Sequence, residues 1–346
     1  MGKTTKRIKK IIKNMALIDE ISKWGKKKVL VVGDALIDKY IFGYTDRISP
    51  DAPIPNVKIE NTNIYIGAIG LVLQFIHSLG GIPEICTIIG NDFEGEFFLK
   101  KIKELKLQTS GILIHEDIKT PQITRIKAMN QHLLRLETDY SIDISQELRE
   151  KFINLIANCS EEIAAILILD YGLGGIFNDQ FIQILLRFLK KNYREVPIIA
   201  RPTVSNYYLY DNIEFIKMNL QKALDTFSIN CCNETSIIIA GKRILNASKC
   251  KNVLLNYLEL DSYLFSREDD KIEKIKPILQ QPVRSYVAVG SVIMAILGLS
   301  YASNISVSKG VKIALFAAAL TATLPPVEFY KPEKLQNFIQ TKMNEL

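Results

Sequence analysis

Short aliphatic runs alternate with helix-like segments along most of this 346-residue chain. The run Val29–Val32 ends at Gly33, as expected of a buried strand that leads into a turn. The predicted strands are Val29–Val32, Glu84–Ile89, Ala164–Leu169 and Pro197–Ala200, and the predicted helices are Leu71–Leu79, Phe93–Leu105, Ser145–Asn158, Asp179–Lys191, Ser291–Tyr301, Ser308–Thr323 and Glu333–Asn344. This alternation predicts a mostly parallel sheet covered by helices on both faces.

A second set of strands is predicted apart from this sheet. Tyr40–Gly43 and Asn56–Glu60 alternate in polarity around a proline-rich loop. Gln122–Ala128 and His132–Glu137 have the pattern of a hairpin that turns at residues 129–131. These four segments predict a small sheet that leaves the main body.

Charge is concentrated at the amino-terminal end of the sequence. The net charge is +7, and no acidic residue occurs from Met1 to Ile18. Beyond that head the chain is close to neutral, so no broad nucleic-acid-binding face is expected. Hydrophobic residues make up 48% of the chain and charged residues 23%, which excludes general disorder.

The basic head has the pattern of an amphipathic helix, with apolar residues at Ile8, Ile11, Ile12, Met15 and Ile18. Three interpretations stay open. The helix can dock on the body, it can act as a mitochondrial targeting segment, or it can lie on a partner or an anionic membrane surface. We expect no secretory signal and no transmembrane segment, because no apolar run reaches ~18 residues.

Five cysteines show neither a C-x-x-C pair nor a histidine spacing suited to zinc. They are Cys86, Cys159, Cys231, Cys232 and Cys250. We therefore expect inert thiols in a reducing compartment, and no metal site.

The segment Val29–Glu60 resembles the opening of pfkB-type sugar kinases, above all the kinase domain of the bifunctional heptose-phosphate kinase/ADP-heptose synthase. The matching positions include Gly33-Asp34, Asp38, Arg47 to Pro50, Pro53, Pro55, Asn130-Gln131 and Asp170-Tyr171. The resemblance implies an α/β fold: a ribokinase-like three-layer α/β/α sandwich with a small β-sheet lid. We expect the basic helix at residues 1–28 and the ribokinase-like domain at 29–330. Lid segments are expected at about 39–60 and 120–137, and a carboxyl-terminal helix at 331–346.

The catalytic loop departs from the family pattern. Where these kinases read Asp-x-x-Gly-Ala-Gly-Asp, this chain reads Ser-Tyr-Val-Ala-Val-Gly-Ser from Ser285 to Ser291. The resemblance places Ser291 where the family has its catalytic base, and a serine has no useful basicity near pH 7. Gly290 is the remaining glycine of the family's anion hole, and Val289 is expected to crowd or reshape it.

Other family positions are also altered. The metal- and phosphate-organising Asn-x-x-Glu motif aligns with Asn219 to Lys222, and a lysine cannot ligate magnesium. Lys222 either supplies positive charge directly or is a surface lysine. The remaining substitutions affect the nucleotide and sugar positions: Asn256 to Asp261, Arg201 to Thr203, Gly67 to Leu71, and Phe316. Several are apolar, which suggests that the cleft is filled.

Two aspartates of the sugar site survive. Asp34 and Asp38 are either vestigial substrate-binding groups or caps of turns at the strand end. Gly290, Asn219 and Lys222 would be the vestigial anion hole and phosphate region. The resemblance implies no catalytic residue, no cofactor and no metal at the family's positions.

Three functions follow from these residues. The first is a catalytically inactive, structural or regulatory subunit of a larger assembly, for example a mitochondrial complex, which contacts protein partners or a membrane surface through its lid and basic helix. The second is a sensor that binds a sugar phosphate or nucleotide without turnover, through Asp34, Asp38 and Lys222. The third is an active ATP-dependent sugar kinase in which Asp170, Glu259 or Asp261 replaces the missing carboxylates. The compartment is predicted to be mitochondrial or cytoplasmic.

Overall fold

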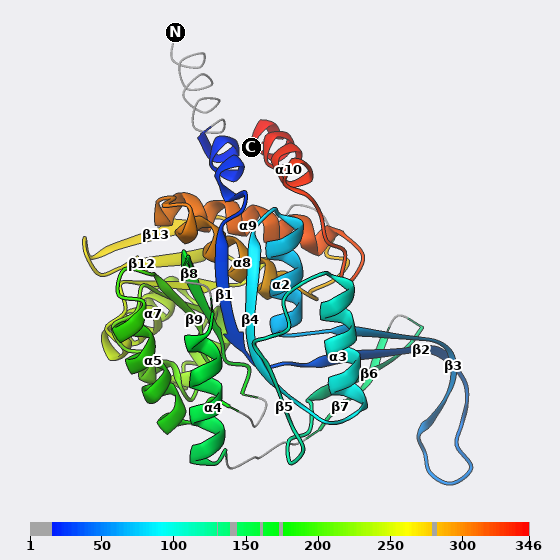
Figure 1. The fold of residues 1–346 in the computed structure, drawn as a ribbon. Coiled ribbons are helices and arrows are strands. Elements are labelled where there is room, and N and C mark those ends of the chain that lie inside the picture. Colours follow the sequence, from blue (N-terminus) through cyan, green and yellow to red (C-terminus); the bar gives the residue numbers. More distant parts are fainter. Residues whose placement is uncertain are drawn as a thin grey trace.

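A nine-stranded sheet forms the centre of the computed structural model of the chain (Figure 1). The structure describes residues 16–129, 131–138, 144–159, 162–172, 176–278 and 282–345. The strands, in spatial order, are β13 (Lys271–Ile275), β12 (Ser262–Ser266), β11 (Asn252–Asn256), β10 (Phe215–Asn219), β9 (Ile198–Arg201), β8 (Ala165–Leu169), β1 (Lys28–Gly33), β4 (Ile82–Gly90) and β5 (Ile112–His115). In this order, the strands from β11 to β5 run parallel to one another. Strand β12 runs antiparallel to both of its neighbours, β11 and β13.

Helices cover both faces of this sheet, as the alternating pattern predicted (Figure 1). One face packs against α2 (Ile69–Ser78), α3 (Phe93–Glu104), α8 (Val289–Ala302) and α9 (Val307–Thr323). The other face packs against α4 (Gln146–Ala157), α5 (Asp179–Asn192), α6 (Leu220–Thr226) and α7 (Glu234–Ser248). Every residue of the central strand β8 is buried, because helices shield it on both sides.

Side-chain caps determine where several helices begin. The Ser145 hydroxyl accepts a hydrogen bond from the Leu148 N–H at 3.2 Å at the start of α4. The Asn178 side chain does the same for the Phe181 N–H at 2.9 Å at the start of α5. These oxygens satisfy N–H groups that have no partner within the helix.

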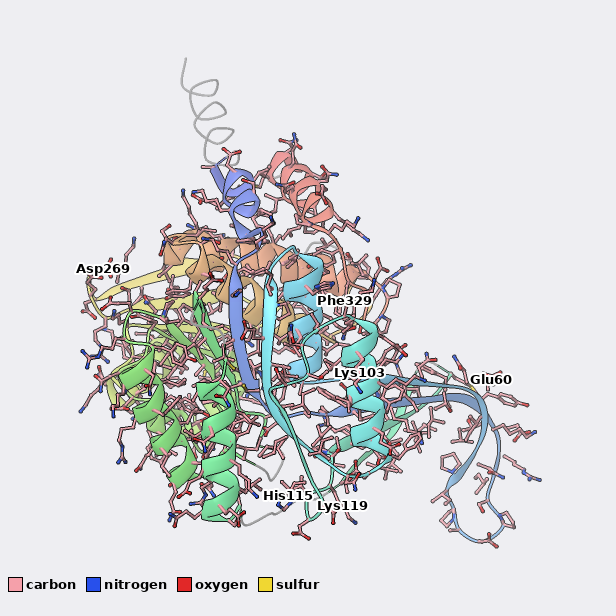
Figure 2. All side chains as sticks on the ribbon, in the orientation of Figure 1. Glu60, Lys103, His115, Lys119, Asp269 and Phe329 are labelled. Atoms are coloured by element: carbon pink, nitrogen blue, oxygen red, sulfur yellow. The ribbon has the colours of Figure 1, made fainter. Side chains whose placement is uncertain are left out.

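A separate four-stranded sheet forms the lid, in the order β3-β2-β6-β7. Its strands are β2 (Ile37–Ile48), β3 (Pro55–Ile66), β6 (Gln122–Ala128) and β7 (Gln131–Glu137). The β2–β3 hairpin extends away from the body, with Glu60 far out along it (Figure 2). The hairpin is longer than the sequence predicted, because its tip is polar and shows no aliphatic pattern.

The described part of the head packs on the body. Residues 16–21 are helical and lead into the short 3-10 helix η1 (Ser22–Trp24). Leu17, Ile21 and Trp24 are buried, and Glu20 forms an ion pair with Lys309 of α9 at 2.6 Å. The carboxyl-terminal helix α10 (Pro332–Glu345) lies beside this segment (Figure 1). Ile8, Ile11, Ile12 and Met15 lie outside the described residues, as does Asn130.

No helix in the described ranges is both long and apolar enough to cross a membrane.

The region from β10 to β13, with α6 and α7, was not predicted from the sequence. Strand β10 reads Phe-Ile-Lys-Met-Asn, and its buried lysine breaks the aliphatic run that would have marked it as a strand. The polar residue that hid this strand is also central to the candidate site.

Candidate functional site

The carboxyl ends of four neighbouring parallel strands bring polar side chains together. Asp34 follows β1 and Asp170 follows β8, whereas Arg201 ends β9 and Asn219 ends β10. In open α/β sheets, ligands bind in the crevice outside this edge.

Asp34 is buried and joins two strand ends. Its Oδ2 accepts a hydrogen bond from the Tyr171 N–H at 2.9 Å, and its own N–H donates to the Leu169 carbonyl at 3.2 Å. Burial, reinforced by the nearby Asp170 carboxylate, raises the pKa of Asp34 to about 8. The side chain is therefore mostly protonated at neutral pH. These bonds agree with the interpretation of Asp34 as a cap at the strand end.

Asp170 is buried and fully engaged by hydrogen bonds. Its Oδ1 accepts from the Gly172 N–H at 3.0 Å, and its Oδ2 accepts from the Asn206 amide at 3.0 Å and the Tyr210 hydroxyl at 3.1 Å. Burial raises the pKa of Asp170. The carboxylate joins the surrounding loops through these three hydrogen bonds.

A cavity of about 460 Å³ opens at this edge, beyond β8, β9 and β10. Its lining combines three cationic side chains with polar groups and two carboxylates. The charged residues of the lining are Arg201, Lys217, Lys222, Asp170 and Asp225. The Arg201 guanidinium stacks over the Tyr171 ring at 3.9 Å from its centroid, which fixes that cation at the cavity wall.

Lys217 is the most unusual residue of the cavity. Its side chain projects from β10 and only 4% of the residue is exposed. Within the described residues, no hydrogen-bond acceptor or carboxylate partners its ammonium group. Burial, with Arg201 and Lys222 nearby, lowers the pKa of Lys217 to about 7. A buried cation without a counter-charge is costly to the folded state, so its presence points to an anionic ligand.

The ammonium of Lys217 lies beside the start of α8. A methyl group added at Gly290 would lie 3.7 Å from the Lys217 Nζ. Gly290 belongs to the first turn of this helix, where backbone N–H groups and the helix dipole favour an anion. The lysine and the helix terminus therefore present positive charge to the same region.

The turn before α8 keeps an unusual backbone conformation. Ala288 has φ 66° and ψ −6°, a left-handed conformation that favours glycine. Val289 is buried in the hydrophobic core at the start of α8, and the expectation that it crowds or reshapes the turn stays a prediction. Ser291 is also buried, in the first turn of α8.

Asn219 and Lys222 lie at the start of α6. The Asn219 side-chain oxygen accepts a hydrogen bond from the Lys222 backbone N–H at 3.2 Å, so Asn219 caps this helix. The Lys222 side chain lines the cavity, and partial desolvation with the nearby Arg201 lowers its pKa. The residue is also exposed to solvent, so it is a surface lysine that lies at the cavity wall, and both interpretations from the sequence stay open.

Asp38 belongs to the lid and is not free. Its carboxylate forms an ion pair with Arg125 of the neighbouring strand β6, and that guanidinium also lies over the Tyr40 ring. Gly67 approaches the same carboxylate so closely that any side chain at position 67 would collide with it. Asp38 therefore forms a structural pair at the base of the lid, apart from the cavity lining.

The structure corrects the expectation that apolar replacements fill the cleft. Leu71 and Phe316 pack into the hydrophobic core, and the cavity beside Lys217 is open and lined by charged groups. Glu259 and Asp261 are absent from that lining. Glu259 accepts a hydrogen bond from Tyr286 at 2.7 Å, and Asp261 pairs with Lys274 at 3.2 Å.

Two residues of this region were missed in the sequence. Lys217 precedes the Asn219 motif by two positions, and a lysine inside an otherwise apolar five-residue segment was the available signal. For Arg125, in the lid, the sequence carried no such signal, because its partner Asp38 is 87 positions away in the chain.

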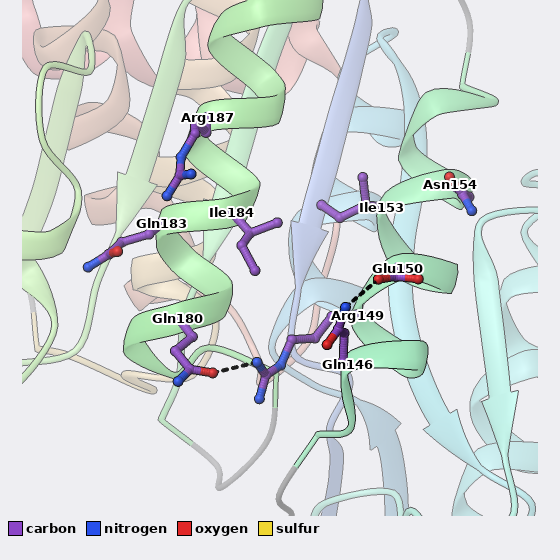
Figure 3. Close-up of a pocket in the computed structure, with 9 residues that line it drawn as sticks. All are labelled: Gln146, Arg149, Glu150, Ile153, Asn154, Gln180, Gln183, Ile184 and Arg187. Atoms are coloured by element: carbon purple, nitrogen blue, oxygen red, sulfur yellow. Dashed lines mark hydrogen bonds between the residues drawn. The ribbon is translucent and has the colours of Figure 1, made fainter.

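A larger crevice of about 630 Å³ lies elsewhere, between the outer surfaces of α4 and α5 (Figure 3). Arg149 donates to the Gln180 side chain across it at 2.6 Å. Its lining of arginines and amides lies on the outer faces of these helices, and none of its residues belongs to the carboxyl ends of the strands. We therefore place the site at the Lys217 cavity.

The chain has the ribokinase-like fold, as the sequence predicted, and its sequence is similar to curated proteins that support the predicted resemblance to pfkB-like carbohydrate kinases. No protein-family profile matches it. The bifunctional protein HldE of Campylobacter fetus is 29% identical over 294 residues, which cover 84% of this chain and 62% of that protein. HldE of Geobacter sulfurreducens is 25% identical and aligns over 88% of this chain and 62% of its own length. The chain thus spans about three fifths of the curated relatives it matches.

Solved structures show the same fold. Arabidopsis thaliana ribokinase complexed with ribose and ATP superimposes with a TM-score of 0.72 at 14% identity, covering 91% of this chain and 99% of that one. Escherichia coli phosphofructokinase-2 in complex with fructose-6-phosphate gives a TM-score of 0.70 at 14% identity, covering 92% and 99%.

Proposed function

We propose that this chain is a non-catalytic pfkB-like protein that binds a phosphorylated small molecule, a sugar phosphate or a nucleotide, in the Lys217 cavity. One observation carries this proposal: the buried ammonium of Lys217, beside the first turn of α8, has no partner among the residues that the structure describes. A phosphate group would supply the missing counter-charge. Arg201 and Lys222 on the same cavity wall would contact its remaining oxygens.

The absence of turnover is part of the proposal and rests on the residues present. The sequence resemblance aligns Ser291 with the base of pfkB-type kinases, and losing a positioned base typically costs about 10²–10⁴ in rate. Asp170 is one of two carboxylates that line the cavity, and three hydrogen bonds already engage it. If the chain does transfer a phosphoryl group, its class implies a carbohydrate kinase.

Binding is expected to need no divalent cation. The cavity offers two lysines and an arginine where phosphate-binding sites often use magnesium, and these cations can neutralise phosphate directly. This distinguishes the proposal from an active kinase, whose phosphoryl transfer depends on metal ions.

Calorimetric titration with fructose 6-phosphate and with ADP, each with EDTA and then with magnesium, tests this proposal. We expect fructose 6-phosphate, ADP or both to bind in the presence of EDTA. The variant Lys217→Met should weaken that binding about tenfold or more, because a charge-assisted hydrogen bond is worth roughly 1.5–3 kcal/mol. Lys242→Met, in an exposed pair with Asp270, is the matched control and should bind normally.

Magnesium-dependent ADP release from ATP and a sugar would show that the chain is an active kinase. Failure of sugar phosphates, nucleotides and inorganic phosphate to bind would overturn the cavity assignment itself.

A second candidate is a structural or regulatory subunit of a larger assembly. One observation favours it: the lid carries exposed aliphatic side chains, with Leu134 at 51% and Leu136 at 49% exposure. Such a surface suits a protein partner better than water. A mitochondrial or cytoplasmic location, and a contact through the basic head, stay predictions.

A further inference from the structure

Two cysteines that are 73 residues apart in the sequence meet in the fold. Cys86 lies on β4, and Cys159 follows the carboxyl end of α4. Their sulfur atoms are 3.4 Å apart. The other cysteines are placed differently: Cys250 is buried beside Ser248, and the adjacent Cys231 and Cys232 are exposed.

The two thiols of this pair differ in access. Cys86 is fully buried in the core between the sheet and α4, whereas Cys159 is only partly buried. A hydrogen bond with Cys86 lowers the pKa of Cys159, and the same contact together with burial raises the pKa of Cys86. Cys159 is thus the accessible, more acidic thiol, and Cys86 lies directly behind it.

The local geometry leaves room for a bond between them. A disulfide needs the sulfurs at about 2.05 Å, so they must approach by roughly 1.4 Å. Cys159 lies one residue beyond the Asn158 cap of α4, outside the regular helix. We expect a change of its side-chain rotamer to bring the sulfurs together without breaking the hydrogen bonds of α4.

We propose that Cys86 and Cys159 form a reversible redox site, in which a small-molecule disulfide such as glutathione disulfide converts the two thiols into an intramolecular disulfide. This inference is independent of the proposed function. It also replaces the expectation from the sequence that all five thiols are inert.

The reaction proceeds by two thiol–disulfide exchanges. The Cys159 thiolate attacks one sulfur of glutathione disulfide, forms a mixed disulfide and releases one glutathione thiolate. The Cys86 sulfur, after losing its proton to solvent, then attacks the Cys159 sulfur and releases the second glutathione. The protein loses two electrons and two protons, and one glutathione disulfide becomes two glutathione molecules.

The bond would tie the sheet to α4 and close a loop that contains α3, β5, β6, β7 and α4. Half of the lid belongs to this loop. Oxidation is therefore expected to raise the midpoint of thermal unfolding, because closing a long loop restricts the unfolded chain.

The test incubates the folded full-length chain with glutathione disulfide, blocks free thiols with N-ethylmaleimide in acid, and maps tryptic peptides by mass spectrometry. We expect a linked peptide pair containing Cys86 and Cys159, no retained glutathione at either position, and reversal by dithiothreitol. The unfolding midpoint should rise on oxidation and return on reduction.

Three variants sharpen the result. Cys86→Ser should leave glutathione attached to Cys159, because the resolving thiol is gone, whereas Cys159→Ser should abolish reaction at this site. A double Cys231→Ser/Cys232→Ser variant should form the linked pair normally. The proposal would be overturned if glutathione stayed attached to Cys159 of the unaltered chain, or if Cys159 formed its disulfide with Cys231 or Cys232 instead of Cys86. This measurement uses the unaltered chain, so it does not depend on whether a variant folds.

Discussion

At the residue scale, Lys217 shows how a functional group can oppose stability. A buried, unpaired ammonium is unfavourable, and its pKa falls from 10.5 in the unfolded chain to about 7 in the folded protein. Between these values the unfolded state binds more protons than the folded state. The free energy of unfolding should therefore rise with pH across that window because of this residue.

Replacing Lys217 by Met tests this linkage. The variant should be more stable at neutral pH, and the difference between variant and unaltered chain should shrink by about 1.4 kcal/mol per pH unit between pH 7 and about 10. Urea unfolding at several pH values measures it. Asp34 has a pKa raised to about 8, so its titration makes the free energy of unfolding fall as the pH rises below that value. Both chains contain Asp34, so its contribution cancels in the difference between them. A difference that does not change with pH would contradict the assigned environment.

Ala288 is a second residue at which local strain is measurable. A left-handed backbone costs a non-glycine residue roughly 1–2 kcal/mol. Ala288→Gly should therefore raise the free energy of unfolding by about 1 kcal/mol, after subtracting the greater flexibility of glycine in the unfolded chain.

Ala295→Gly, within the same helix α8, is the control for Ala288→Gly. Ala295 lies in the buried interior of α8, so glycine should destabilise there by about 1 kcal/mol. Thermal or urea unfolding of the two variants gives opposite signs if the turn is strained, and the same sign if it is not.

At the scale of elements, the lid depends on one buried pair between two strands. Asp38 of β2 and Arg125 of β6 have side chains that are 9% and 19% exposed. Because removing one partner leaves a buried charge, Arg125→Met should destabilise the protein by about 3 kcal/mol.

The same sheet offers a matched control for Arg125→Met. Lys58 of β3 pairs with Asp46 of β2 at an exposed position, with side chains 50% and 39% exposed. Lys58→Met should cost less than about 1 kcal/mol, since surface pairs contribute little. Equal losses for the two variants in urea unfolding would show that the pair at the base of the lid is not special.

At the scale of the whole molecule, one face of the lid exposes aliphatic side chains, among them Leu134 and Leu136. Strand register places Ile41, Ile126 and Leu134 side by side, with Leu136 further along β7. Asp38 and Arg125 lie on the opposite face, since side chains alternate along a strand. We expect a second copy of the chain to cover this aliphatic face.

Sedimentation velocity of the purified chain should then show a dimer. The double substitution Leu134→Glu and Leu136→Glu should give a monomer that still binds anions, because neither residue lines the cavity. A monomeric unaltered chain at micromolar concentration would contradict this expectation and weaken the assembly candidate.

The sequence alone determined the fold class and much of the architecture, because aliphatic periodicity and turn residues are local signals that survive without coordinates. It predicted the parallel sheet, most of its covering helices and the lid, but not the region from β10 to β13 with α6 and α7, where Lys217 interrupts the aliphatic run of β10. That Ser291 departs from the catalytic loop of pfkB-type kinases stays a prediction. Whether side chains fill or line a cleft depends on contacts between distant segments, so only the tertiary structure showed an open cationic cavity. The same holds for the Asp38–Arg125 pair and the meeting of Cys86 with Cys159. In each case the decisive distance joins residues that are dozens of positions apart, and packing of the whole chain sets it.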